Sequence, residues 1–148
     1  MAWGKTYSGR YKVKNTGKYI GDYKNVVYRS SWEKVAFKWC DSQSSIEAWN
    51  SEEVIVPYYS EIDGKRHRYF IDLQIKMNGK VYLVEIKPKN QTRPPKTRRK
   101  TKKYITEVTT YVTNTCKWKA ANEYAKDRGW KFEIWTEDTL RSMGMKII

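Results

Sequence analysis

The chain has few of the residues that build disulfide frameworks, metal clusters and membrane spans. Its 148 residues include two cysteines and one histidine. Cys40 and Cys116 lack metal-ligand spacing, so we expect both to be reduced packing residues in a cytosolic setting. His67 is too isolated for a metal cluster, and with Arg66 and Arg68 we expect it to contact phosphate or solvent. No apolar run approaches the roughly 20 residues that cross a membrane, and no signal-peptide pattern opens the chain.

Acidic residues are also scarce. Lys and Arg number 30 against 16 Asp and Glu, which leaves a formal net charge of +14. Such an excess attracts polyanions, and nucleic acid is the usual partner of a strongly basic domain. The length favours a single domain that is large enough for a real core. Most of the seven Trp and twelve Tyr are expected to pack in that core.

A β-hairpin is predicted in the middle of the chain. Two extended runs, residues 69–75 and 80–87, flank Asn78-Gly79. This dipeptide is strongly favoured in a tight type I′ hairpin turn, because both turn residues need a positive φ. We therefore expect the two runs to be antiparallel neighbours.

Three charged side chains lie along this hairpin in a pattern that suits metal chemistry. Side chains alternate faces along a strand, so Glu85 and Lys87, two residues apart, share one face. If Asp72 of the first strand falls on that face, the hairpin holds two carboxylates and an ammonium together. The pattern then predicts a divalent-metal site with a cation beside it.

Asp72, Glu85 and Lys87 resemble the D…(D/E)-x-K signature of the PD-(D/E)XK nucleases. Alone, E-x-K occurs by chance in many basic proteins. Here it ends an apolar strand, after a hairpin whose first strand carries an Asp, and that is the context the motif requires. Ile71 stands where the family name has proline. The alternative is a solvated β-hairpin with charges on its outer face.

The clearest helix begins near Ser30 and runs to about Asp41. Residues 30–33 have the S-x-x-E pattern of a capping box, and an apolar stripe follows at helical spacing: Trp32, Val35, Ala36, Trp39 and Cys40. Glu33 has two possible roles. It can reach back to the Ser30 amide as a capping residue, or it can be the third acid that many PD-(D/E)XK enzymes place on a helix before the sheet. Since Glu33 lies off the strongest apolar stripe, we expect it to face the cleft.

The remaining elements complete an α/β fold with a mixed sheet, in the order α-β-β-β-α-β-α of a restriction-endonuclease-like core. A break at Asn114 is considered for the long helix because threonines weaken helix propensity, and Gly129 is predicted as the C′ residue that ends it. Pro57 suggests an edge strand or a bulge. The predicted elements are a strand at 52–59, a helix at 101–128, a strand at 130–135 and a helix at 137–143.

Two basic segments flank or interrupt this core. Residues 1–29 alternate basic side chains and tyrosines, and we define them as an N-terminal arm before a nuclease domain at 30–148. The arm can lie along a phosphate backbone with its tyrosines stacked on bases, or wrap the domain and bury them, and the two interpretations are compatible. Residues 87–103 carry basic residues, prolines and no acid. One interpretation of this segment is a solvated loop. Because it directly follows the predicted metal site, we expect instead that its basic side chains clamp the phosphate backbone.

Longer segments carry a closer resemblance. YRSSWEK at 28–34, GKRHRYFIDL at 64–73, VEIKPK at 84–89, NTCKWKAA at 114–121 and FEIWTEDTLRSMG at 132–144 resemble the head completion nucleases of T-even-type tailed phages. Those proteins are in turn similar to the endonuclease subunit of Tn7-like transposases. Residue by residue, Glu33, Asp72, Glu85 and Lys87 match the active-site positions.

This resemblance implies a virion-associated endonuclease that processes DNA at the portal end of a filled head before the tail joins. It implies portal or head-tail connector proteins as partners, no membrane, and a location in the virion and in the cytoplasm of the infected bacterial host. The family pattern also implies 5′-phosphate and 3′-hydroxyl products. The alternatives are a non-enzymatic DNA-binding head plug with a vestigial site, or a ribonuclease.

The predicted cofactor is Mg²⁺, with Mn²⁺ as a substitute. Mg²⁺ usually takes one or two protein carboxylates and keeps several waters. Asp72 and Glu85 would be those ligands, beside the Ile86 carbonyl, with Glu33 bound directly or through water. Lys87 orients or deprotonates the nucleophile or stabilises the phosphorane; we favour stabilisation because a lysine among acids stays protonated. The residues predicted to contact DNA are Arg29, Ser30, Arg66, Arg68, Lys89, Arg93, Arg98 and Arg99.

Overall fold

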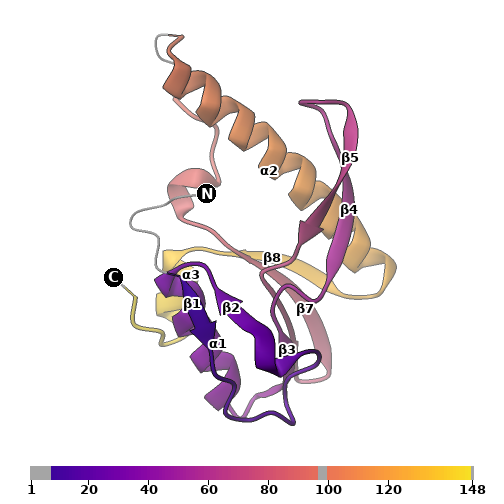
Figure 1. The fold of residues 1–148 in the computed structure, drawn as a ribbon, viewed down its shortest axis with the longest axis vertical. Helices are drawn as coiled ribbons and strands as arrows, with labels where there is room; N and C mark the ends of the chain where they lie inside the picture. Colours follow the sequence, from indigo (N-terminus) through magenta and orange to yellow (C-terminus); the bar gives the residue numbers. More distant parts are fainter. Residues whose placement is uncertain (1–7, 97–99, 148) are drawn as a thin grey trace.

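A four-stranded mixed sheet lies at the centre of the computed structural model, which describes residues 8–96 and 100–147 (Figure 1). Its strands are β3 (Ile46–Asn50), β6 (Leu73–Met77), β7 (Lys80–Ile86) and β8 (Lys131–Trp135), in the spatial order β3-β6-β7-β8. The first three strands are antiparallel neighbours, and β8 runs parallel to β7. A parallel neighbour requires a crossover connection, which here is a long helix.

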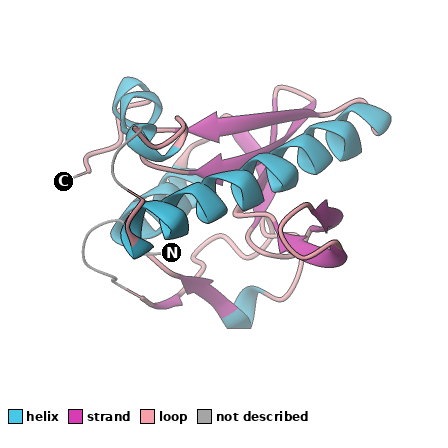
Figure 2. Ribbon diagram, turned by 90° about the horizontal axis from the view of Figure 1, so that it is seen from above, coloured by secondary structure: helices cyan, strands magenta, loops and turns pink. Residues whose placement is uncertain are grey.

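Helices cover both faces of this sheet. Helix α1 (Ser31–Ser42) and the short α3 (Glu137–Ser142) pack on one face, and α2 (Lys102–Asp127) packs on the other. Figure 2 shows α2 from above as it runs beside the strands. In the basic segment before α2, η2 (Lys89–Gln91) forms a single 3-10 turn. Within the described ranges, no helix combines the length and the apolar character that spanning a membrane requires.

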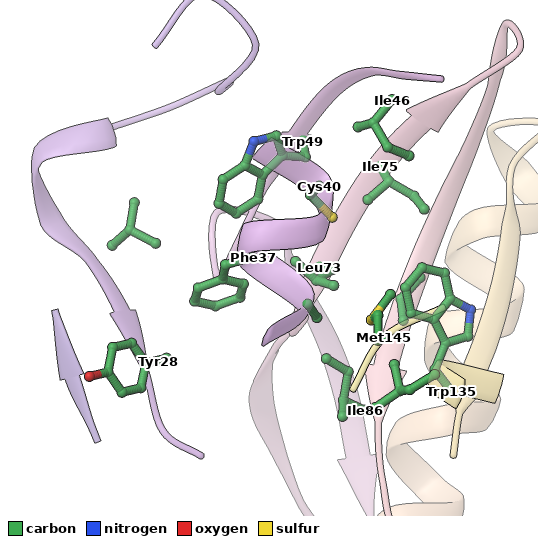
Figure 3. Close-up of a cluster of buried hydrophobic side chains, with 14 of the residues drawn as sticks. Tyr28, Phe37, Cys40, Ile46, Trp49, Leu73, Ile75, Ile86, Trp135 and Met145 are labelled. Atoms are coloured by element: carbon green, nitrogen blue, oxygen red, sulfur yellow. The ribbon is translucent and has the colours of Figure 1, made fainter. Parts of the chain in front are cut away.

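The larger hydrophobic cluster lies between α1, α3 and the sheet (Figure 3). Phe37 of α1 is fully buried and its ring centroid lies 5.5 Å from that of Trp49 on β3. Leu73, Ile86 and Trp135 continue the cluster across β6, β7 and β8. The predicted stripe of α1 is confirmed at Ala36 and Cys40, but it missed Phe37, while Trp32, Val35 and Trp39 pack around the edge of the cluster.

The N-terminal segment is part of the same core. Strands β1 (Gly9–Tyr11) and β2 (Val26–Tyr28) pair with each other, and η1 (Tyr23–Asn25) precedes β2. Tyr19 and Tyr28 are buried, and the backbone of Ile20 donates to the carbonyl of Trp49. The interpretation that the segment wraps the domain and buries its tyrosines is confirmed for Tyr19 and Tyr28, whereas Tyr23 is exposed. The first seven residues lie outside the described part of the chain.

A separate two-stranded ribbon corrects the predicted strands. The predicted strand at 52–59 corresponds to β4 (Ile55–Ser60), which pairs only with β5 (Lys65–Phe70) within the described residues. The sheet strand after α1 is β3 instead. The predicted single strand at 69–75 is also wrong, because β5 ends before Ile71 and β6 begins after Asp72. At that junction the Ile71 amide donates to the Val54 carbonyl, so the chain changes partners there.

The central hairpin and the ends of the helices follow local chemistry. Asn78 and Gly79 have φ values of 53° and 75°, which confirms the predicted turn with two positive φ values. Helix α2 runs without a break through Asn114, so the considered interruption is wrong. Gly129 has φ of 76° directly after the C-cap Arg128, as predicted for the C′ residue.

Candidate active site

Four predicted catalytic residues line one cavity of about 540 Å³. They come from three elements: Glu33 from the first turn of α1, Asp72 from the junction of β5 and β6, and Glu85 with Lys87 from the end of β7. The register of β6 with β7 pairs Leu73 with Val84. Extending this register by one pair places Asp72 opposite Glu85, on one face, as the sequence pattern requires.

Asp72 is close enough to both Glu33 and Glu85 for their charges to act on it. Its Oδ2 accepts a hydrogen bond of 2.8 Å from the Ile86 amide. Burial raises the pKa of its carboxyl well above the usual value, and the nearby charges of Glu85 and Glu33 raise it further. Lys87 lowers this pKa only in part. Asp72 therefore holds a proton more tightly than a free carboxyl does, because it is buried beside two other acids.

Glu85 is held from two sides. The Lys87 ammonium lies 3.1 Å from Oε2, and the Tyr69 hydroxyl donates a hydrogen bond to Oε1. All three residues are buried. Burial, followed by the Glu85 charge, raises the pKa of Tyr69 well above its usual value, so this phenol stays protonated and acts as a donor. These contacts fix the carboxylate before any ligand arrives.

Glu33 both starts its helix and faces the cavity. The Ser30 hydroxyl accepts from the Glu33 amide at 3.2 Å, as in a capping box. The Glu33 carboxylate accepts from the Arg29 amide at 3.1 Å, so of the two roles considered for this side chain, the structure does not favour the bond to the Ser30 amide. Burial raises the pKa of Glu33 to about 7. The hydrogen bond from the Arg29 amide lowers this pKa, and the charges of Glu52 and Glu85 raise it further.

Sequence reasoning missed several residues of the cavity. Glu52 forms a two-pronged pair with Arg29, at 2.7 Å to Nε and 2.9 Å to Nη2. The Lys117 ammonium of α2 lies 5.4 Å from the centroid of the Tyr69 ring, and both side chains line the cavity. A positive φ of 58° at Glu52 marks a turn that the sequence pattern does not reveal. Glu52 and Lys117 come to the site only through the tertiary fold, so their spacing from the motif residues along the sequence does not predict their place there.

The predicted DNA-binding residues fall in different places. Arg29, Ser30 and Arg68 line the cavity, together with Ile86. Arg66 is exposed on β5 and does not line this cavity. Lys89 and Arg93 line a different pocket, and the Lys89 ammonium lies 3.2 Å from Asp138. Arg98 and Arg99 lie outside the described residues.

The oxygen donors suit a hard divalent cation. Among the described residues, no group of three or more His, Cys, Asp or Glu side chains is placed to hold a metal ion. Mg²⁺ needs only one or two carboxylates plus water. Asp72 and Glu85 lie opposite each other on adjacent strands, and Ile86 lines the same cavity. The donor set therefore fits Mg²⁺ bound by two acids.

Two comparisons with known proteins each found a relative of this chain. The model of the N-terminal domain of TnsA-like endonucleases matches residues 43–137. The head completion nuclease of Enterobacteria phage T4 is 45% identical over 146 residues, which cover 95% of this chain and 97% of that protein. No solved structure matches the chain significantly.

Proposed function

The chain belongs to the family of TnsA-like endonucleases, and from this membership we propose that it is a Mg²⁺-dependent endonuclease that hydrolyses phosphodiester bonds in DNA. The observation that carries the proposal is the meeting of Glu33, Asp72, Glu85 and Lys87 in one cavity. The formal net charge of +14 favours a polyanionic substrate.

Asp72 and Glu85 would hold the cation, with the Ile86 carbonyl beside them and Glu33 bound directly or through water. Bound Mg²⁺ would acidify a water molecule and neutralise charge on the phosphate. The contacts of Glu85 with Tyr69 and Lys87 hold its carboxylate in place, which lowers the cost of assembling the site.

Lys87 would stabilise the negative charge that develops on the phosphorus centre. Its ammonium is already fixed by Glu85, so little reorganisation is needed when the substrate enters. Arg29 and Arg68 line the same cavity and would contact phosphates next to the scissile bond. These cations supply binding as well as chemistry.

We further propose a role at the portal end of the filled phage head, in the virion and in the cytoplasm of the infected host. The support is the 45% identity with a protein named for head completion. In this role the enzyme would process packaged DNA before the tail joins, and a portal or connector protein would be its partner.

The test is a cleavage assay with linear, nicked, branched and single-stranded DNA, and with RNA, in the presence and absence of Mg²⁺. We expect Mg²⁺- or Mn²⁺-dependent DNA cleavage that is lost in Asp72→Ala and Glu85→Ala. Asp127→Ala is the matched control, because this exposed acid lies at the far end of α2.

Cleavage in EDTA, or at the wild-type rate in the site variants, would refute the metal mechanism. DNA binding without cleavage would favour an inert head plug, and cleavage confined to RNA would favour a ribonuclease.

A further inference from the structure

A second groove of about 690 Å³ runs between the basic segment after β7 and helix α2. Figure 1 shows the chain leaving β7, passing through η2 and returning along α2. Lys87 and Lys117 line this groove and also the active-site cavity, so the two spaces meet at these lysines. A ligand held in the groove therefore lies directly beside the proposed scissile position.

The α2 side of the groove is a stripe of threonines. Thr109 and Thr110 lie three and four residues after Thr106, Thr113 lies three residues after Thr110, and all four line the groove. Thr106 bonds back to the Lys102 carbonyl at 2.9 Å. The other three hydroxyls have no hydrogen-bond partner within the described part of the chain. Threonine weakens a helix, so four of them on one face suggest a use other than helix stability.

Asn114 provides an independent observation at the end of this stripe. Its side chain is only 7% exposed and lines the groove. Among the described residues, no group forms a hydrogen bond with its amide. The Asn114 amide is not one of the fully buried polar atoms that lack a partner, so it opens onto the groove and is available to a ligand there.

The charges of the groove select the ligand. Arg93 and the two shared lysines stand against a single acid, Glu107, among the residues that line it. The remaining polar groups are hydroxyls and amides that can donate to oxygen. This combination suits the phosphate oxygens of a nucleic-acid backbone, which donors on side chains bind without regard to sequence.

We propose that the groove holds the sugar-phosphate backbone of the cleaved DNA strand, on one side of the scissile phosphate. Asn114 and the hydroxyls of Thr109, Thr110 and Thr113 donate to phosphate oxygens, and Lys117 bridges the groove and the active site. The proposal rests on the proposed function for the nature of the substrate. It adds a strand path on α2 that the catalytic residues alone do not define.

The experiment measures DNA binding in EDTA, by fluorescence anisotropy, so that no cleavage is needed. The variants are Asn114→Leu and the triple change Thr109→Val, Thr110→Val and Thr113→Val, which keep side-chain shape. Each is expected to weaken binding about tenfold, the equivalent of one or two lost hydrogen bonds. Thr115→Val is the matched control, because this hydroxyl bonds to the Val112 carbonyl and does not line the groove.

A second arm identifies the ligand as phosphate backbone. Duplexes carry a single neutral methylphosphonate linkage at successive positions along the cleaved strand. At one or two positions next to the scissile bond, neutralisation should weaken binding by the wild type and have little further effect on the groove variants. Equal sensitivity at every position, or wild-type affinity in both groove variants, would overturn the proposal.

The two proposals fail in different ways. Groove-dependent binding by a protein that never cleaves DNA would refute the endonuclease and keep the strand path. Metal-dependent cleavage that needs Asp72, with unchanged binding by the groove variants, would refute the strand path and keep the endonuclease.

Discussion

The Lys87 ammonium lies 3.1 Å from Oε2 of Glu85, and the two side chains are 7% and 8% exposed. In a buried ion pair the attraction between the partners offsets the cost of removing both charges from water, and removing one partner leaves the other charge buried without that compensation. Lys87 is therefore both a candidate catalytic cation and a structural partner. Its two roles can be separated by choosing the substitution.

Lys87→Met should abolish cleavage and lower the free energy of unfolding of the metal-free protein by about 3 kcal/mol. DNA affinity should fall little, because one of many phosphate contacts is removed. Cleavage assays, urea unfolding and anisotropy measure the three effects. The double variant Lys87→Met, Glu85→Gln removes both charges, so it should regain most of the stability and none of the activity. A cleaving Lys87→Met variant would remove Lys87 from the mechanism.

Tyr69→Phe tests whether the hydroxyl prepares Glu85 for the metal. The variant loses one hydrogen bond to a buried carboxylate, which should cost about 2 kcal/mol of stability. Mg²⁺ affinity, measured by calorimetry, should fall at least about tenfold. Tyr58→Phe is the control: Tyr58 is a buried tyrosine of the same ribbon whose hydroxyl bonds to none of the described residues. Equal Mg²⁺ affinities in the two variants would contradict the prediction.

Asp72→Asn should unfold at or above the midpoint of the metal-free wild type. The pKa of Asp72 is raised in the folded protein, so the native state binds the proton more tightly than the unfolded state. Stability is therefore lost as the pH rises from the ordinary value of 3.8 through the folded pKa, and the neutral amide avoids this loss.

The same variant should lose the stabilisation by Mg²⁺. At ten times its dissociation constant, Mg²⁺ should stabilise the wild type by about 1.4 kcal/mol and Asp72→Asn by much less. Thermal melts at neutral pH, with and without Mg²⁺, measure both effects. A clearly lower metal-free midpoint for Asp72→Asn would make Asp72 an ordinary structural acid.

Local chemistry explains what could be predicted from the sequence. The turn at Asn78 and Gly79 and the cap at Ser30 depend on neighbouring residues, so their patterns are visible in the chain. The same holds for the spacing of Glu85 and Lys87. These features were enough to predict that Asp72 and Glu85 share one face of the hairpin.

Tertiary contacts explain what could not be predicted. Strand β3 is short, and an irregular register between Ile46 and Ala48 disturbs its alternation. Between β5 and β6 the buried residues continue to alternate through Ile71, so the period hides the change of partner. Packing of Ala121 and Ala125 against the ribbon and sheet supports α2 despite its threonines.

The last prediction concerns Asp41, which ties the N-terminal segment to α1. This side chain is 2% exposed and accepts from the amides of Lys14 and Asn15 at 2.8 and 2.9 Å, and from the Tyr11 hydroxyl at 2.8 Å. Burial alone would raise the pKa of Asp41, but these hydrogen bonds outweigh it and lower the pKa below 3.8. The carboxylate therefore stabilises the fold above that pH, and this contribution is lost as the pH falls through the folded pKa.

Asp41→Asn should lower the free energy of unfolding by about 2 kcal/mol at neutral pH. Its stability should also fall less steeply on acidification, whereas Asp127→Asn, on an exposed acid, should follow the wild type. Urea unfolding at a series of pH values measures both slopes, and an acid limb in Asp41→Asn as steep as that of the wild type would contradict this role.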